Sequence, residues 1–173
     1  MRIALPAALL AGLATPALAA DLTVGIQIPS MKVAEYHRPY VAIWIENSDE
    51  AAVKTLAVWY DTKNAKGEGA TWLKDMRQWW RRTGRSLDKT AINAVSSPTK
   101  APGKQQLVVP AARLADLKPG AYTLVVEAAR EVGGREVVKI PFTWTGPQNK
   151  NGGGKGGSDA GASELSAITL TIK

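Results

Sequence analysis

The sequence contains no cysteine and a single histidine, His37. Disulfide scaffolds, iron–sulfur clusters, zinc knuckles and multi-histidine metal sites need residues that are missing, so all four are excluded. Hydrolase and nucleotide-loop signatures are also missing: there is no Gly-x-Ser-x-Gly, no His-Glu-x-x-His and no glycine loop followed by Lys-Ser/Thr. A triad through His37 stays open, because its partners would meet only in the fold, but no nucleophile stands out. A conventional hydrolase is therefore not expected.

Long apolar runs are missing everywhere except at the N-terminus. There, Arg2 precedes the apolar stretch from Ile3 to Leu18, and Ala17-Leu18-Ala19 has the small-x-small form that signal peptidase reads. We expect a signal peptide over residues 1–19 and a periplasmic or secreted mature chain, with no transmembrane span after cleavage. A retained N-terminal anchor is the competing interpretation.

The chain is basic, with a formal net charge of +7 and a pI near 9.7. Export makes nucleic acid an unexpected partner, which leaves an anionic membrane surface, an acidic partner or solubility alone as the reason for this charge. The 173 residues, of which 45% are hydrophobic and 21% charged, suit one globular domain over residues 20–173.

Short segments with a two-residue alternation of apolar and polar side chains dominate the mature chain. The expected strands are residues 22–28, 41–46, 56–61, 91–95, 106–109, 122–128, 137–144 and 167–172. Asn47 to Glu50 and Gly133-Gly134 are turn signals that predict two hairpins. Leu-x-Pro-Gly-x-Tyr, ending at Tyr122, resembles the tyrosine corner of Greek-key sandwiches.

One segment has a helical period instead. Apolar residues at Trp72, Leu73, Met76, Trp79 and Trp80 alternate with charged positions, which predicts an amphipathic helix over 72–82. Thr71 is its expected N-cap and Gly84 its expected left-handed end. Its aromatic stripe is interpreted as core packing, with a ligand platform as the alternative.

Residues 146–162 are rich in Gly, Asn, Lys and Ser, with no apolar side chain larger than alanine, so a flexible loop is expected there. About eight strands with one inserted helix and no βαβ alternation indicate an all-β fold. We predict an antiparallel, immunoglobulin-like (Greek-key) β-sandwich.

His37 lies just before the expected strand 41–46, in a loop at the sandwich edge where ligands are often held. It is a candidate ligand for haem iron or copper, with Met31, Met76, tyrosines or carboxylates as the remaining donors. The alternative is an ordinary surface or hydrogen-bonded histidine.

Two stretches carry a resemblance to a known family. One is Tyr-His-Arg-Pro-Tyr-Val-Ala-Ile-Trp-Ile-Glu-Asn from Tyr36, and the other is Trp-Leu-Lys-Asp-Met-Arg-Gln-Trp-Trp-Arg-Arg-Thr-Gly-Arg from Trp72. With Ala101-Pro102-Gly103 and Ser163-Glu164-Leu165 downstream, they resemble the domain of unknown function 2271 over nearly the whole mature chain. The resemblance implies a periplasmic protein that acts beside a PepSY-type membrane reductase and an FMN transferase. It implies extracytoplasmic electron transfer linked to iron reduction or uptake.

Relatives in that family carry Asp-x-x-Ser/Thr-Gly-Ala-Thr, which resembles the motif for covalent FMN attachment at its final threonine. The matching stretch here is Asn93-Ala-Val-Ser-Ser-Pro-Thr99, which keeps Ser96 and Thr99. Asn93 replaces the acid, Ser97 the glycine and Pro98 the alanine, so the turn has lost a glycine and an N–H. By resemblance, Thr99 is the FMN acceptor, with Lys100 as a nearby cation for the phosphate.

A second candidate stretch, Gly69-Ala70-Thr71, keeps Gly-Ala-Thr but is interpreted as a helix cap at Thr71. The resulting prediction is an electron-transfer protein that carries covalent FMN and serves a membrane reductase. The alternative is a cofactor-free module that binds a partner protein or small ligand through the sandwich-edge loops and the basic helix face.

Overall fold

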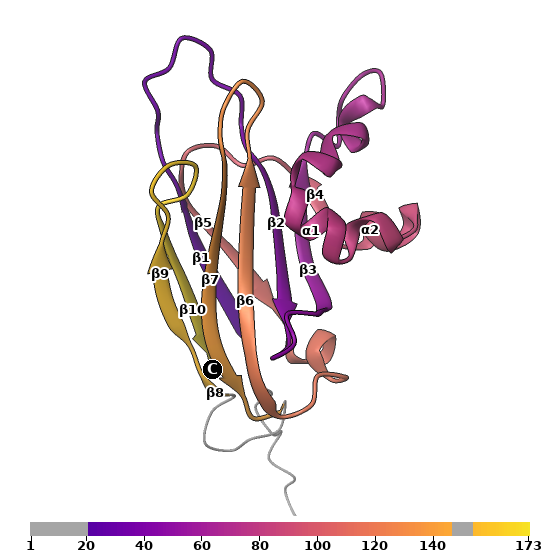
Figure 1. Cartoon of the computed structure of the whole chain (residues 1–173), viewed down its shortest axis with the longest axis vertical. Helices are drawn as coiled ribbons and strands as arrows, with labels where there is room; N and C mark the ends of the chain where they lie inside the picture. The colour runs from indigo at the N-terminus through magenta and orange to yellow at the C-terminus, as the bar shows by residue number, and fades with distance from the viewer. Residues whose placement is uncertain (1–20, 147–153) are drawn as a thin grey trace, which may run out of the picture.

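The computed structural model describes residues 21–146 and 154–173, so the predicted signal peptide lies outside the described residues. Two β-sheets pack face to face, and a helical segment covers the outer side of one of them (Figure 1). Within the described ranges, no helix has the length and apolar character needed to cross a membrane.

The smaller sheet has four strands in the order β5-β1-β10-β9. Its strands are β1 (Leu22–Ile28), β5 (Gly103–Val109), β9 (Gly157–Ala160) and β10 (Ala167–Ile172). All three pairings are antiparallel. The N-terminal strand β1 therefore lies between two strands from the second half of the chain.

The larger sheet has six strands in the order β4-β3-β2-β6-β7-β8. Its strands are β2 (Tyr40–Glu46), β3 (Ala52–Tyr60), β4 (Ser96–Pro98), β6 (Gly120–Ala129), β7 (Arg135–Trp144) and β8 (Gly154–Lys155). Both expected hairpins, β2–β3 and β6–β7, are present, and only the edge strand β4 runs parallel to its neighbour. The two-sheet, mostly β architecture is thus as predicted, while the immunoglobulin-like Greek-key assignment stays a prediction.

The main core lies between the sheets. Alternate residues of β1 are buried, and their partners across the gap come from β2, β6 and β7, as two-residue alternation requires. Trp144 is fully buried, and its indole Nε1 donates to the carbonyl of Leu117 at 3.0 Å. The Tyr122 hydroxyl donates to the carbonyl of Lys118 at 2.8 Å, which confirms the predicted tyrosine corner.

A second core lies on the outer face of the six-stranded sheet. The segment between β3 and β4 forms four short helices that cover this face: η1 (Glu68–Asp75), α1 (Arg77–Arg82), η2 (Gly84–Ser86) and α2 (Lys89–Ala94). Leu73, Met76 and Trp79 from these helices pack on Trp44 and Val125 of the sheet. Another short helix, η3 (Ala111–Leu114), follows β5.

The prediction of one continuous helix over residues 72–82 is wrong, because the helix is interrupted at Met76, between η1 and α1. The new helix start is capped by a buried carboxylate from the sheet: Glu127 on β6 accepts from the backbone N–H of Gln78 at 3.0 Å and of Trp79 at 2.7 Å. Such N–H groups have no partner within the helix, so the charged acceptor satisfies them and stabilises the break. Arg135 of β7 pairs with the same carboxylate at 2.9 Å.

Three smaller predictions in this region are also wrong. Thr71 lies inside η1, whose N-cap is Gly67 in a left-handed conformation. Gly84 does not end a helix in that conformation. It is needed for close packing, because a Cβ there would lie 2.7 Å from the Trp79 ring. Residues 91–95 are not a strand, since Asp88 accepts from the N–H of Ala91 and starts α2.

The β6–β7 hairpin is present but its turn is longer than the predicted Gly133-Gly134 pair. Ala129 pairs with Arg135, so five residues form the connection. Val132 has a φ of 51°, and the N–H of Gly133 donates to the carbonyl of Arg130.

The prediction of a flexible loop over residues 146–162 is wrong for residues 154–162. Residues 147–153 lie outside the described part of the chain. After β8 the chain crosses from one sheet to the other and becomes β9, which pairs with β10. Glycine permits this crossing, because a Cβ on Gly156 would lie 2.0 Å from the carbonyl oxygen of Leu170. Backbone pairing therefore orders a segment that has few apolar side chains.

The loop between β9 and β10 is fastened by Glu136 of β7. Its carboxylate accepts from the backbone N–H groups of Ala162, Ser163 and Leu165. Burial raises the pKa of the Glu136 carboxyl, but these hydrogen bonds lower it, and the net pKa lies below the ordinary value of 4.5.

Glu127→Gln tests the cap on α1. We expect a loss of about 2 kcal/mol in the free energy of unfolding, because an amide nitrogen would face a backbone N–H that needs an acceptor. Urea denaturation measures the loss. Glu131→Gln, at an exposed position on the neighbouring turn, is the control and should change stability by less than about 0.5 kcal/mol. Equal stability of Glu127→Gln and the wild type would contradict this account.

Glu136→Gln tests the fastened loop through its pH dependence. A lowered pKa contributes stability that is present above pH 4.5 and is lost as the pH falls through the folded-state pKa. The variant should be less stable than the wild type at pH 7, and the difference should shrink below pH 4.5. Chemical denaturation over this pH range measures it, and a difference that is constant with pH would rule the explanation out.

Candidate functional site

A cleft of about 950 Å³ lies at one end of the sandwich. It is formed where the β1–β2 loop, the β6–β7 turn and the start of the helical segment come together, at the top of Figure 1. The lining residues are Tyr36, His37, Arg38, Tyr40, Asp61, Asn64, Glu68, Trp72, Asp75, Arg77, Thr99, Ala129, Arg130, Glu131, Val132, Gly133, Gly134 and Arg135. Its size is within the range of small-molecule and cofactor sites.

The cleft has four arginines and four carboxylates in its lining. Arg135 is paired with Glu127, and Arg130 makes a two-point ion pair with Glu164 at 2.8 and 3.1 Å. Arg38 and Arg77 are exposed and form no ion pair with any residue that the structure describes. These two cations are therefore available to an anionic ligand.

Three aromatic side chains line the same cleft. The Tyr40 hydroxyl donates to the carbonyl of Gly69 at 3.2 Å, and burial raises the pKa of this phenol. Trp72 is 52% exposed, which sets it apart from the buried Trp79 of the predicted aromatic stripe. The stripe is therefore core packing at Leu73, Met76 and Trp79, while Trp72 offers a ring to the cleft.

His37 lies in the cleft between two carboxylates. Its Nε2 is 2.9 Å from Glu35 and its Nδ1 is 3.4 Å from Glu131, so the acids lie on different ring nitrogens. A metal ion bound to one ring nitrogen would therefore not reach both carboxylates. The described residues contain no group of three or more His, Cys, Asp or Glu side chains that could hold a metal ion. A metal role for His37 stays a prediction that this arrangement does not support.

The structure gives the three residues of the predicted FMN site, Thr99, Ser96 and Lys100, different surroundings. Thr99 lines the cleft, its N–H donates to the carbonyl of Tyr60 at 3.2 Å, and its hydroxyl has no hydrogen-bond partner among the described residues. Ser96 instead donates its hydroxyl to the carbonyl of Ile92 at 2.6 Å. Lys100 places its Nζ 5.4 Å from the centre of the Trp59 ring. Thr99 and His37, selected for unrelated reasons, thus share one cleft.

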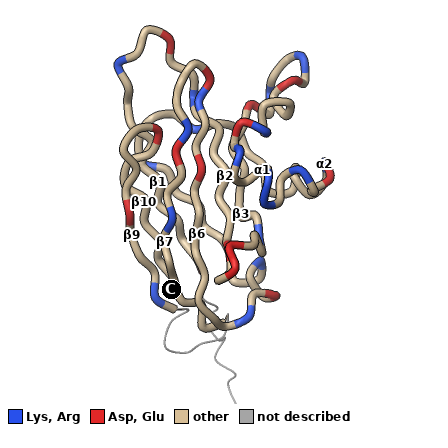
Figure 2. Tube along the Cα trace, viewed as in Figure 1, with Lys and Arg blue, Asp and Glu red and all other residues tan. Residues whose placement is uncertain are grey.

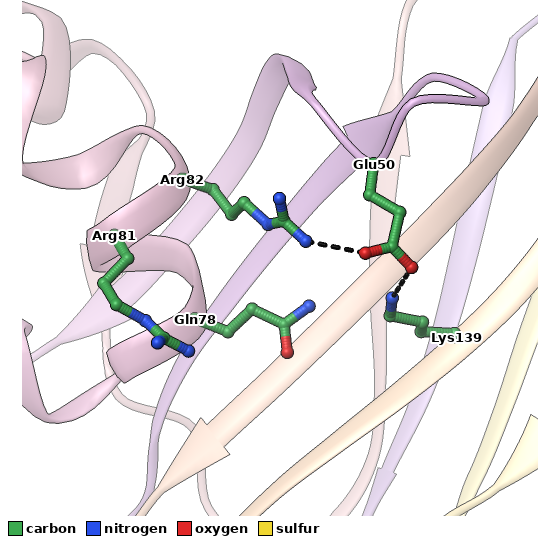
Figure 3. Close-up of a pocket in the computed structure, with 5 residues that line it drawn as sticks. All are labelled: Glu50, Gln78, Arg81, Arg82 and Lys139. Carbon is green, nitrogen blue, oxygen red and sulfur yellow. Dashed lines mark hydrogen bonds and ion pairs between the residues drawn. The ribbon is translucent and has the colours of Figure 1, made fainter.

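A smaller pocket of about 430 Å³ lies between α1 and the six-stranded sheet. Arg82 and Lys139 converge on Glu50, at 2.8 and 3.2 Å (Figure 3). The hydrogen bonds and charges of Lys139 and then Arg82 lower the pKa of the Glu50 carboxyl. Beneath them, the buried Glu46 accepts from the indole Nε1 of Trp44 at 3.0 Å. This cluster fastens the helical segment to the sheet.

The helical segment also carries a basic surface, which we define as Lys74, Arg77, Arg81, Arg85 and Lys89. All five are exposed, and none is in an ion pair with a described residue. Figure 2 shows Lys and Arg positions along α1 and toward α2, on the part of the molecule that projects from the sheets. This surface suits an acidic partner.

The fold and the cleft together define a two-sheet β-protein with a loop-lined cleft at one end. A family described as predicted periplasmic protein matches residues 21–162. The chain belongs to this family, the domain of unknown function 2271 (DUF2271), which confirms the resemblance and the predicted periplasmic location. No curated protein and no solved structure matches the chain.

Several cleft residues were not found from the sequence. Tyr36 lies in the stretch singled out for His37, but nothing in that stretch indicates that its ring lies 6.0 Å from the guanidinium carbon of Arg130. Arg130 and Glu164 are far apart in the chain, and no local pattern signals their ion pair. Trp72 was assigned to the core because helical spacing does not tell a covered turn from an exposed one.

Ser96→Ala and Thr99→Val test the different roles of these two hydroxyls. Ser96→Ala should lower the free energy of unfolding by about 1 kcal/mol, since it removes a hydrogen bond to a backbone carbonyl. Thr99→Val should change it by less than about 0.5 kcal/mol, since no bond is lost. Thermal and urea denaturation of both variants check this. A destabilised Thr99→Val would mean that the hydroxyl is structural.

Proposed function

We propose that this protein is a periplasmic electron carrier that holds FMN through a phosphoester bond to Thr99 and serves a membrane-bound reductase of the PepSY type. The observation that carries the proposal is the position of Thr99: its hydroxyl lacks a partner among the described residues, and the residue lines a cleft of about 950 Å³. The resemblance alone suggests the reductase and the link to iron reduction or uptake.

The residues around Thr99 suit a flavin nucleotide. Arg38 and Arg77 supply cations for a phosphate, since neither is neutralised by a described partner. Trp72 supplies an exposed aromatic face for an apolar ring system. When bound, FMN would supply one- and two-electron transfer, while the chain would anchor, orient and shield it.

The departures from the family motif do not obstruct the acceptor. Pro98 ends β4, the edge strand of its sheet, where a missing N–H breaks no ladder. The next residue, Thr99, still donates its N–H to Tyr60 and is held in place. Asn93 lies in the last turn of α2, where a short polar side chain is well tolerated.

The attachment of FMN to Thr99 is a phosphoryl transfer from a flavin dinucleotide. The Thr99 hydroxyl oxygen forms a bond to the FMN phosphorus of a flavin dinucleotide, and the pyrophosphate bond breaks. The nucleoside monophosphate leaves, and the hydroxyl proton goes to solvent or to the leaving group. An FMN transferase is the partner that the resemblance provides for this step.

The basic surface on the helical segment gives the proposal a second part. An electron carrier must meet its reductase, and five unpaired cations favour a partner that presents acidic groups. We also propose that the two sheets have the immunoglobulin-like Greek-key connectivity, which the tyrosine corner at Tyr122 supports.

A cofactor-free binding module is the second candidate. The observation in its favour is that the cleft mixes four arginines with four carboxylates, a lining that hydrogen-bonds polar ligands without a covalent anchor. The experiment below separates the two candidates.

Export of the protein with and without an FMN transferase tests the proposal by intact mass. We expect a gain of one FMN unit only when the transferase is present, with the modified peptide containing Thr99 and the spectrum showing flavin absorbance. Thr99→Val should abolish the gain completely.

Two controls make the result specific. Thr71→Val removes the threonine of Gly69-Ala70-Thr71 and should leave the FMN gain unchanged. Ser97→Gly with Pro98→Ala restores the family motif and should raise the modified fraction if attachment is incomplete. A bare mature mass under every condition would exclude the flavin proposal and favour the binding module.

A further inference from the structure

The Arg130 side chain has one nitrogen without a partner. Its Nε and Nη2 donate to the two carboxylate oxygens of Glu164, and its side chain is only 7% exposed. The remaining nitrogen, Nη1, is buried and has no hydrogen-bond partner in the described part of the chain. Arg130 lines the large cleft, so a strong donor is left unused there.

Tyr36 presents a second unused donor beside it. The guanidinium carbon of Arg130 lies 6.0 Å from the Tyr36 ring, and the Tyr36 hydroxyl is also buried without a partner among the described residues. Burial raises the pKa of this phenol, so it is protonated at neutral pH and can donate. The two donors come from the β1–β2 loop and the β6–β7 turn, which both line the cleft.

Such an arrangement is unfavourable for a protein that binds nothing at this point. A buried polar group without a partner destabilises the folded state, and most buried polar groups in proteins have a hydrogen-bond partner. The geometry is nevertheless held firmly, since Glu164 also accepts from the N–H of Gly134 at 2.7 Å. A Cβ on Gly133 would lie 2.3 Å from Arg130, so glycine lets the turn close over the guanidinium.

The charges around the two donors indicate what they would accept. The charges of Arg130 and Arg38 lower the pKa of the Tyr36 hydroxyl and that of Glu164 raises it, so two of the three charged groups that act on this phenol are cations. A buried guanidinium N–H and a phenol O–H are both donors, and together they suit a negatively charged oxygen acceptor.

We propose that Tyr36 and Arg130 form an oxyanion subsite in the cleft, which binds the carboxylate or phosphate group of a small ligand. Both donor atoms are shielded from water, so binding requires the β1–β2 loop or the β6–β7 turn to shift enough for the ligand to reach them. The proposal goes beyond the FMN carrier and does not depend on it, because neither donor belongs to the Thr99 segment.

The test uses the mature protein exported without an FMN transferase. Sodium acetate and inorganic phosphate are titrated separately at constant ionic strength, with sodium chloride as the blank, and binding is followed by NMR shifts of the Arg130 side chain and by tryptophan fluorescence. Binding of acetate alone assigns the subsite to carboxylates, and binding of phosphate alone assigns it to phosphates. Binding of neither overturns the proposal.

Tyr36→Phe is the decisive variant, because it removes only the hydroxyl. We expect about tenfold weaker anion binding together with unchanged or higher stability of the ligand-free protein, since an unsatisfied group is lost. Tyr122→Phe is the matched control: its hydroxyl is hydrogen-bonded outside the cleft, so it should lose stability and keep full anion affinity. Unchanged affinity in Tyr36→Phe, or a loss of its stability, overturns the proposal.

The outcome is distinguishable from failure of the FMN proposal. Flavin attachment is read from the mass of Thr99 peptides, whereas the subsite is read from anion titration of flavin-free protein.

Discussion

Glu127 is fully buried, and its carboxylate joins three parts of the molecule: strand β6, the start of α1 and Arg135 on β7. A charge in this position is stable only because each oxygen accepts hydrogen bonds from fixed donors. The chain must therefore break at Met76 to present the N–H groups of α1 to the sheet. The break sends the preceding turn, η1, toward the end of the sandwich, where Trp72 lines the cleft.

The cleft lies where loops connect the strands of the two sheets. Neighbouring strands end at similar heights, so the connecting loops lie together at the two ends of the sandwich, where core packing constrains their side chains less. At this end a second buried ion pair, Arg130 with Glu164, fixes the β6–β7 turn to the segment before β10. Two buried carboxylates thus hold two of the cleft walls in place. The third wall, the β1–β2 loop, carries Tyr36 and His37.

The same geometry gives the candidate residues very different surroundings. Thr99 follows an edge strand held by backbone bonds to β3, and its hydroxyl has no hydrogen-bond partner in the described part of the chain. Ser96, three residues earlier, uses its hydroxyl to bind the end of α2, and Lys100 covers Trp59. Resemblance could not separate these roles because a motif records residue order, whereas the roles depend on which neighbours the fold places around β4 and the residues that follow it. Among the three, only Thr99 lines the cleft.

The sequence by itself determined seven strands (β1, β2, β3, β5, β6, β7 and β10), the two hairpins and the tyrosine corner, because alternation and turn residues act over a few neighbouring residues. It did not determine β8 and β9, where glycine-rich chain is ordered by backbone pairing and by the Glu136 carboxylate. It did not determine the break at Met76, since the capping group comes from Glu127, about fifty positions away. Tertiary structure alone brought Tyr36, Thr99 and Arg130 to one cleft, because their proximity depends on strand order and buried charge pairs rather than on local sequence.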